Sequence, residues 1–275
     1  MKFLLFIARI GKEAAKDDLF AMASQLTYKI LLAFFPFLIF LISLLGFLNL
    51  DQSYWTNMIT GALPGEAASM INDFISGIVN TKNAGVLSLS LLVTIYNASA
   101  GFSVAIHCIN QTYGFKYCRS FIKSVFVSVL LMLLFTLSLT SMLVLIIFND
   151  AIMAFLQSHF NMSGFVVSLF NFAGFLLTLA VLIMTTMLVY KLSLCKKNSF
   201  MSFLPGAMIT VICWVVSSKV FNIYVNNFAK YSNVYGSIAG IFILIMWLNL
   251  ISTSLLIGSE INSMLDPNAD PKDRP

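Results

Sequence analysis

Charged residues are scarce in this sequence. Only 10% of its 275 residues are Asp, Glu, Lys or Arg, whereas about 25% is usual for soluble proteins. Hydrophobic residues make up 59% of the chain, which is more apolar surface than a soluble protein of this length can bury. The shortage of charge therefore excludes an ordinary soluble fold and favours an integral membrane protein.

Histidine and cysteine are also scarce, which narrows the chemistry the chain can perform. The only histidines, His107 and His159, stand on either side of the apolar stretch 123–148, so a membrane span between them prevents a shared metal site. The four cysteines show no CxxC spacing and predict free thiols, not disulfides or zinc ligands. Paired carboxylates, a GxSxG elbow, a P-loop and an HExxH sequence are all absent. The sequence thus predicts no enzyme, no metal and no cofactor.

Long apolar runs fill most of the chain. A spanning helix needs roughly 20 mostly apolar residues, and barrel strands would instead alternate over about ten residues. The predicted fold class is an all-α integral membrane bundle of six transmembrane helices with amphipathic interfacial helices. The six stretches are Leu26–Leu48, Val86–Ile106, Lys123–Phe148, Phe165–Tyr190, Phe203–Ile223 and Ile238–Ile261.

The positions of the 16 basic residues predict the topology. Twelve precede the first span, follow the last, or lie between spans two and three and between spans four and five. The alternate loops hold only Lys82 and Lys230. Cytoplasmic loops carry an excess of Lys and Arg, so both termini are expected in the cytoplasm. The net charge of +5 is thereby explained without nucleic acid, and membrane lipids are the expected partners.

One six-span domain, residues 1–265, is expected, followed by a polar tail over 266–275. Apolar residues at helical spacing before Lys16 predict an interfacial helix over residues 1–18; a helix packed on the bundle is the alternative. A second amphipathic segment is expected on the outer side, over 52–84. Pro36 is expected to kink the first span.

Polar residues inside the spans are the most informative feature, because each must be compensated in hydrocarbon. In the second span they fall on both faces, which predicts a central helix shielded from lipid. Ser, Thr and Gly more often serve only helix packing, whereas Asn, Lys and Glu are costlier to bury. The predicted substrate path comprises Ser90, Thr94, Asn97, Lys219, Asn249, Thr253 and Glu260.

Glu260 is the one acid clearly within a predicted span. Two hypotheses stay open for it. Its carboxylate pairs with Arg119 or Lys29, which would offset its desolvation, or it takes up protons or a cationic group during transport.

Several blocks of sequence resemble the YihY/BrkB family of bacterial inner-membrane proteins. They run in the family's order along nearly the whole chain, and together they are specific. The blocks are AMASQLTYKILLAFFPFLIFL (Ala21–Leu41), NASAGF (Asn97–Phe102), INQTYGF (Ile109–Phe115), RSF (Arg119–Phe121), FLPGA (Phe203–Ala207), YSNVYGSIAG (Tyr231–Gly240), WLNL (Trp247–Leu250) and IGSEIN (Ile257–Asn262).

The resemblance implies a six-span protein of the bacterial cytoplasmic membrane, with a virulence association in some members. It implies little chemistry; some members have carried a ribonuclease label, which the lack of an aqueous acid–base or metal site here argues against. The residues that match the family pattern are Tyr28, Pro36, Asn110, Tyr113, Gly114, Arg119, Pro205, Gly206, Asn233, Tyr235, Gly236, Gly258, Glu260 and Asn262. Lys29 departs from it, standing where relatives usually have an aromatic residue.

The leading hypothesis for function is a transporter or a translocator of lipids or other envelope molecules, with a polar path among its spans. The alternative is a non-transporting scaffold or envelope assembly factor, in which the same residues only hold helices together. An intramembrane enzyme or ribonuclease ranks last. A homo-oligomer and an envelope protein partner both stay open.

Overall fold

A computed structural model describes residues 2–47, 84–115, 119–159, 164–196, 198–228 and 232–266. Every element within these ranges is helical. They are α1 (Lys2–Lys16), α2 (Leu19–Phe47), α5 (Ala84–Thr112), α6 (Phe121–His159), α7 (Gly164–Ser193), the short 3-10 helix η1 (Phe200–Phe203), α8 (Leu204–Phe228) and α9 (Ser232–Leu265). Helices suit such apolar segments because each satisfies its own backbone hydrogen bonds where water is absent.

The predicted all-helical class is confirmed, whereas the count of six spans is not. Among the described residues, five helical stretches are long and apolar enough to cross a membrane: Ala84–Thr112, Ile122–Met142, Phe165–Ser193, Phe200–Phe221 and Phe242–Leu265. The remaining expected span, Leu26–Leu48, overlaps a shorter apolar stretch, Leu19–Phe34, within α2. The helix α2 continues past Pro36 to Phe47. The expected outer amphipathic segment lies outside the described residues except for Ala84, which begins α5, and so does the tail after Asp266.

The break between α1 and α2 falls at two acidic residues. Asp18 has a φ of 51°, in the left-handed region that Asp tolerates better than most side chains. The chain turns there, and the backbone N–H of Met22 then bonds to the Asp18 carbonyl at 3.1 Å as α2 begins. A separate helix is therefore present over Lys2–Lys16. Its expected place at the membrane interface stays a prediction.

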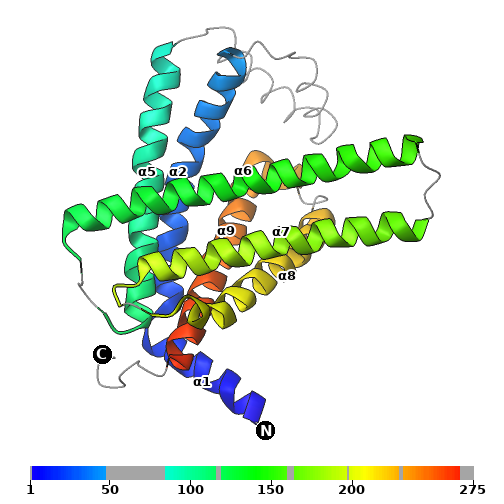
Figure 1. Cartoon of the computed structure of the whole chain (residues 1–275). Coiled ribbons are helices and arrows are strands. Elements are labelled where there is room, and N and C mark those ends of the chain that lie inside the picture. Colours follow the sequence, from blue (N-terminus) through cyan, green and yellow to red (C-terminus); the bar gives the residue numbers. More distant parts are fainter. Residues whose placement is uncertain are drawn as a thin grey trace.

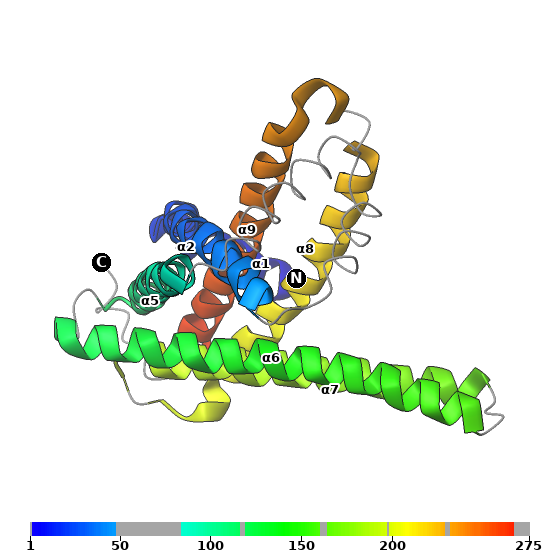
Figure 2. The ribbon, with the colours of Figure 1, turned by 90° about the horizontal axis from the view of Figure 1, so that it is seen from above.

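The helices run in neighbouring pairs (Figure 1). Helix α2 lies beside α5, α8 beside α9, and the hairpin of α6 and α7 crosses the other helices, as the view from above confirms (Figure 2). The first turns of α2 and α8 and the last turns of α5, α7 and α9 come together at one end (Figure 1), where α1 packs against α2 and α9. We call this region the closed end.

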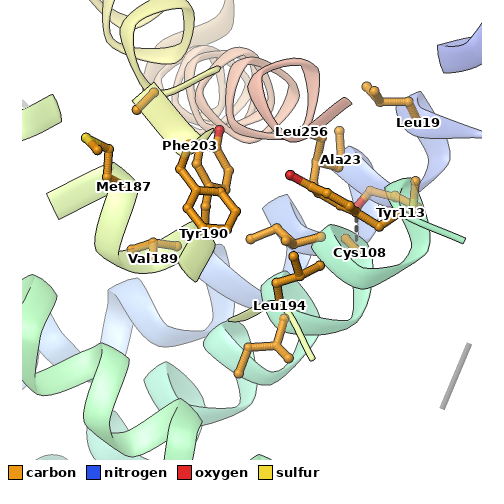
Figure 3. Packing of buried hydrophobic residues seen from close by; sticks show 14 of the residues in the cluster. Leu19, Ala23, Cys108, Tyr113, Met187, Val189, Tyr190, Leu194, Phe203 and Leu256 are labelled. Carbon is orange, nitrogen blue, oxygen red and sulfur yellow. Dashed lines mark hydrogen bonds between the residues drawn. The ribbon is translucent and has the colours of Figure 1, made fainter. Parts of the chain in front are cut away.

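A cluster of buried apolar side chains fills the closed end (Figure 3). Leu19, Ile109, Tyr190 and Leu256 are fully buried there and come from α2, α5, α7 and α9. Large apolar side chains along the rest of α5, α6 and α7 are instead exposed, as expected of helices that face lipid.

Candidate functional site

Buried polar side chains from four helices meet at the closed end, and we call this set the junction. Its members are Asn110 and Thr112 of α5, Tyr190 of α7, Thr210 of α8, and Ser259, Glu260, Asn262 and Ser263 of α9.

The start of α8 is held by a side chain from α9. The first turn of a helix leaves backbone N–H groups without intrahelical partners. The N–H of Gly206 donates to Asn262 Oδ1 at 2.8 Å, and Asn262 Nδ2 donates to the Phe203 carbonyl at 3.3 Å. Pro205 has no N–H to satisfy and suits this first turn. Asn262 therefore caps α8 from a neighbouring helix.

Helices α8 and α9 touch through two glycines. A Cβ added to Gly206 would collide with the carbonyl oxygen of Gly258, and one added to Gly258 would lie 2.6 Å from the Gly206 carbonyl oxygen. Only glycine allows so close an approach of two backbones. Both belong to blocks that suggested the family resemblance, and the contact gives a physical reason for glycine at each.

Tyr190 links three helices beside this contact. Its hydroxyl donates to the Leu255 carbonyl at 2.7 Å and lies 2.7 Å from the hydroxyl of Thr210. Thr210 lies 2.9 Å from the Gly206 carbonyl oxygen of its own helix. The ring and hydroxyl are fully buried, and a buried tyrosine hydroxyl requires such partners. Sequence reasoning placed Tyr190 at the end of a span but gave it no role.

The end of α7 is held by Asn110, in the last turn of α5, and by Arg119, just before α6. Asn110 Nδ2 donates to the Ser193 carbonyl at 2.8 Å, and the Cys195 N–H donates to Asn110 Oδ1 at 3.0 Å. The guanidinium of Arg119 donates to the carbonyls of Leu192 and Leu194 at 2.9 and 2.8 Å. These carbonyls have no partners within the helix. Burial lowers the pKa of the Arg119 guanidinium.

Cys195 corrects the prediction that all four cysteines are free. Cys108 and Cys213 are free thiols, but Cys195 is in a disulfide, whose partner lies outside the described residues. The prediction failed because cysteine spacing along the chain does not report which loops meet in the fold. Here Asn110 and Arg119 bring the α5–α6 connection against the backbone around Cys195.

Helix α5 is joined directly to α9. The hydroxyls of Thr112 and Ser259 lie 2.6 Å apart, and Ser263 donates to the Thr112 carbonyl at 2.7 Å. Gly114 follows with a φ of 83°, a conformation that favours glycine. Its N–H bonds to the Gln111 carbonyl at 2.9 Å and ends the helix.

Glu260 lies inside the junction with 0% of its surface exposed. Tyr113 follows the last turn of α5. Burial raises the pKa of Tyr113, and the nearby charges of Asp266, Tyr190 and Glu260 raise it further. Asp266, where the polar tail was expected to begin, is itself buried and accepts a hydrogen bond from Asn198 Nδ2 at 2.6 Å. Two carboxylates therefore lie near one buried tyrosine at the closed end. Arg119, one of the cations considered as a partner for Glu260, donates two hydrogen bonds to carbonyls at the end of α7.

The predicted central position of the second span is wrong for its first half. Helix α5 exposes Leu89, Leu92 and Tyr96 at 64%, 65% and 74%. The polar side chains of this half bond to carbonyls of their own helix: Ser90 to Leu87, Thr94 to Ser90, and Asn97 to Val93, at 3.0, 2.6 and 2.9 Å. They therefore need no hydrogen bond from a neighbouring helix. Apart from Ser90, the buried residues of α5 begin at Gly101, in its second half.

The other residues of the predicted path lie in different settings. Asn249 Nδ2 points to the hydroxyls of Ser24 and Thr27 of α2, at 3.4 and 3.5 Å. Thr253 is partly buried in α9, and Lys219 is exposed on α8. A substrate path through these residues stays a prediction.

The remaining residues of the family pattern divide by location. Tyr28 is exposed on α2 and Pro36 lies inside that helix. Asn233, Tyr235 and Gly236 lie in the first turns of α9. Tyr113 is buried in the apolar cluster of the closed end. The pattern thus includes three residues of the junction, Asn110, Glu260 and Asn262, and the two glycines in contact beside it, Gly206 and Gly258. It did not include the other members of the junction: Thr112, Tyr190, Thr210, Ser259 and Ser263.

Comparison with known proteins decides the family. The family model described as Virulence factor BrkB matches residues 10–275. The chain belongs to this family. It is also 30% identical over 243 residues to the Bacillus subtilis protein YfkH, whose name calls it ribonuclease-like, with 88% of each chain covered.

A second relative extends the match along the whole BrkB-family chain. A UPF0761 membrane protein of Psychromonas ingrahamii is 25% identical over 273 residues, covering 96% of this chain and 88% of its own. No solved structure matches. The expected family and the multi-pass membrane location are therefore confirmed, while transport and the orientation of the termini stay predictions.

Proposed function

We propose that this BrkB-family protein translocates a lipid or another envelope molecule across the bacterial cytoplasmic membrane, with both termini in the cytoplasm. The observation that carries the proposal is Glu260, a carboxylate with 0% exposure inside the apolar helix α9. A charged side chain in a span costs at least about 2.5 to 3.5 kcal/mol on lenient scales. Such residues persist mainly where function requires them.

The junction has the character of a gate that is closed in this state. Its contacts are hydrogen bonds between separate helices, such as Thr112 to Ser259 and Tyr190 to Thr210. Each bond of this kind contributes only about 1 kcal/mol net, so a transport cycle can exchange them. A change in the charge or contacts of Glu260 would act on the same helices α5, α8 and α9.

Reconstitution into vesicles tests the proposal. Fluorescent phospholipids are incorporated in both leaflets, and a membrane-impermeant reductant then quenches the outer leaflet. Lipid translocation by the wild-type protein extends quenching beyond that half, and Glu260→Gln lowers its rate. Wild-type vesicles that behave as empty ones rule out phospholipid translocation under these conditions, and an export assay with cell-envelope extracts then tests the other substrates.

A scaffold role is the second candidate, and one observation favours it. Ser90, Thr94 and Asn97 bond within α5, so these three side chains serve local helix structure. A scaffold requires the junction to be intact but does not require an ionisable Glu260. Pull-down of a defined envelope protein together with full function of Glu260→Gln would favour this candidate.

We propose no enzymatic role. Nuclease chemistry needs acid–base groups in contact with water and RNA, and Glu260 and Asp266, the carboxylates near Tyr113, are both buried. The word ribonuclease in the name of YfkH is therefore not extended to this chain. A purified protein that cleaves RNA, and loses that activity in Glu260→Gln, would reverse this view.

A further inference from the structure

The exposed face of α2 carries polar side chains where an apolar helix would be expected to show only hydrocarbon. Leu19–Phe34 is an apolar stretch, yet Ser24, Gln25 and Tyr28 are exposed on it, with Tyr28 at 57%. Positions 24, 25 and 28 share one side of a helix by the 3.6-residue period. Lys29, partly exposed, flanks that side.

Asn249 of α9 completes this polar face. Its Nδ2 reaches Ser24 and Thr27 only at 3.4 and 3.5 Å, at the long limit of hydrogen-bond geometry. The side chain is partly exposed rather than buried. We call Ser24, Gln25, Tyr28, Lys29 and Asn249 the α2–α9 polar face.

We propose that the α2–α9 polar face binds the phosphate headgroup of an anionic phospholipid. The proposal deepens the proposed function, on which it rests, by naming a substrate class and an entry site. Tyr28, Gln25 and Asn249 present hydrogen-bond donors, and Lys29 adds a positive charge, which together match phosphate oxygens. Phe20 and Leu32, exposed at 66% and 38% on the same helix, offer surface to an acyl chain.

Charge decides between a lipid and a second copy of this chain as the occupant. A symmetric dimer through this face would place the same patch on both subunits and bring one Lys29 near the other, which disfavours that contact. The exposed acid Asp18 lies just before α2, about 16 Å from Lys29 along the helix axis. An anionic headgroup at Lys29 therefore meets a locally positive surface.

Lipid binding to the purified protein tests the inference without a transport assay. Native mass spectrometry is used to titrate phosphatidylglycerol and phosphatidylcholine against the wild type, Lys29→Gln and Lys123→Gln. Lys123 is the matched control because it is an exposed lysine at the start of another apolar helix, α6. The wild type is expected to prefer phosphatidylglycerol. Lys29→Gln is expected to weaken this binding about fivefold, because it removes one cation next to the headgroup. Lys123→Gln is expected to bind as the wild type does.

Photocrosslinking gives an independent readout of position. Phosphatidylglycerol with a photoreactive group next to the headgroup is expected to label α2 between Phe20 and Leu32, and labelling falls in Tyr28→Phe and Asn249→Leu. If Lys29→Gln does not fold, Lys29→Arg, which keeps the charge, must retain the labelling while Tyr28→Phe lowers it.

Three results would overturn the inference. They are equal loss of binding in the Lys29→Gln and Lys123→Gln variants, equal binding of both lipids by the wild type, and displacement of lipid by a dimer cross-linked through Gln25→Cys. Headgroup-specific labelling without translocation in vesicles leaves the inference standing and counts against phospholipid transport. The two proposals can therefore fail separately.

Discussion

Gly206 of α8 and Gly258 of α9 meet backbone to backbone, and neither position has room for a side chain. A Cβ on Gly206 would collide with the Gly258 carbonyl oxygen and lie 2.5 Å from the side chain of Asn262, which caps the same turn. The first turn of α8 is therefore fixed to α9 by a steric fit and a hydrogen bond at one point. Along the chain, Thr210 follows Gly206 by four residues and Glu260 follows Gly258 by two.

Gly206→Ala is expected to destabilise the protein. Because the obstructing atom is a backbone oxygen and not a mobile side-chain tip, the helices must separate, at a cost of about 1 to 3 kcal/mol. Thermal unfolding in detergent measures the loss. Gly101→Ala is the matched control, since a Cβ there meets nothing within 4 Å, and it is expected to be neutral or mildly stabilising. Equal unfolding temperatures for both variants would contradict the close contact.

Arg119→Lys is expected to loosen the end of α7. The guanidinium reaches the carbonyls of Leu192 and Leu194 together, and a lysine ammonium lacks that forked geometry. The expected cost is about 1 to 3 kcal/mol for a carbonyl left unsatisfied. Limited proteolysis near Cys195 reports the loosening. The reverse exchange at the exposed Lys123, Lys123→Arg, should leave the cleavage rate unchanged. A similar rate for both variants would count against a stabilising role for the Arg119 hydrogen bonds.

Tyr113 is expected to make the fold sensitive to alkaline pH. Burial and nearby negative charge raise its pKa above the ordinary value, so the folded state holds the phenol proton more tightly than the unfolded state does. This contribution to stability is complete below about pH 10 and is lost as pH rises further, by at most about 1.4 kcal/mol per pH unit. Chemical denaturation between about pH 9 and 11 should show a shallower fall in Tyr113→Phe. Tyr96→Phe, at an exposed site, should keep the wild-type slope, and a wild-type slope in both variants would refute the prediction.

The first half of α5 is expected to face lipid. Cysteines at Leu89, Leu92 and Tyr96, the exposed positions, should react with a lipid-soluble probe in membranes. A cysteine at Ile109, which is fully buried, should not react. Protection of all three outer positions would instead support a central second span, as the sequence alone suggested.

Sequence reasoning found the helices because length and apolar composition fix them locally. It also identified Asn110, Gly206, Gly258, Glu260 and Asn262 through blocks that resemble a known family. It missed the pairing of Tyr190 with Thr210 and of Thr112 with Ser259. The reason is that the sequence does not show whether a hydroxyl in a span bonds to its own helix or to a neighbouring one. The error on α5 has the same cause. Polarity on two faces suggested a central helix, but Ser90, Thr94 and Asn97 satisfy themselves locally.

The central claim is that Glu260 serves function and is not needed to hold the junction together. Two adjacent changes separate these roles. Ser259→Ala removes the bond to Thr112 and should lower the unfolding free energy by about 1 kcal/mol. Its function per molecule should persist. Glu260→Gln keeps the shape and removes the charge, so abundance should stay near the wild-type level while function is lost.

The most direct measurement is complementation of a deletion strain by Glu260→Gln, normalised to membrane abundance and compared with Ser259→Ala. The account predicts that Glu260→Gln loses complementation at normal abundance. It predicts that Ser259→Ala has reduced abundance but retains complementation per molecule. A Glu260→Gln protein at wild-type abundance with full complementation would contradict it.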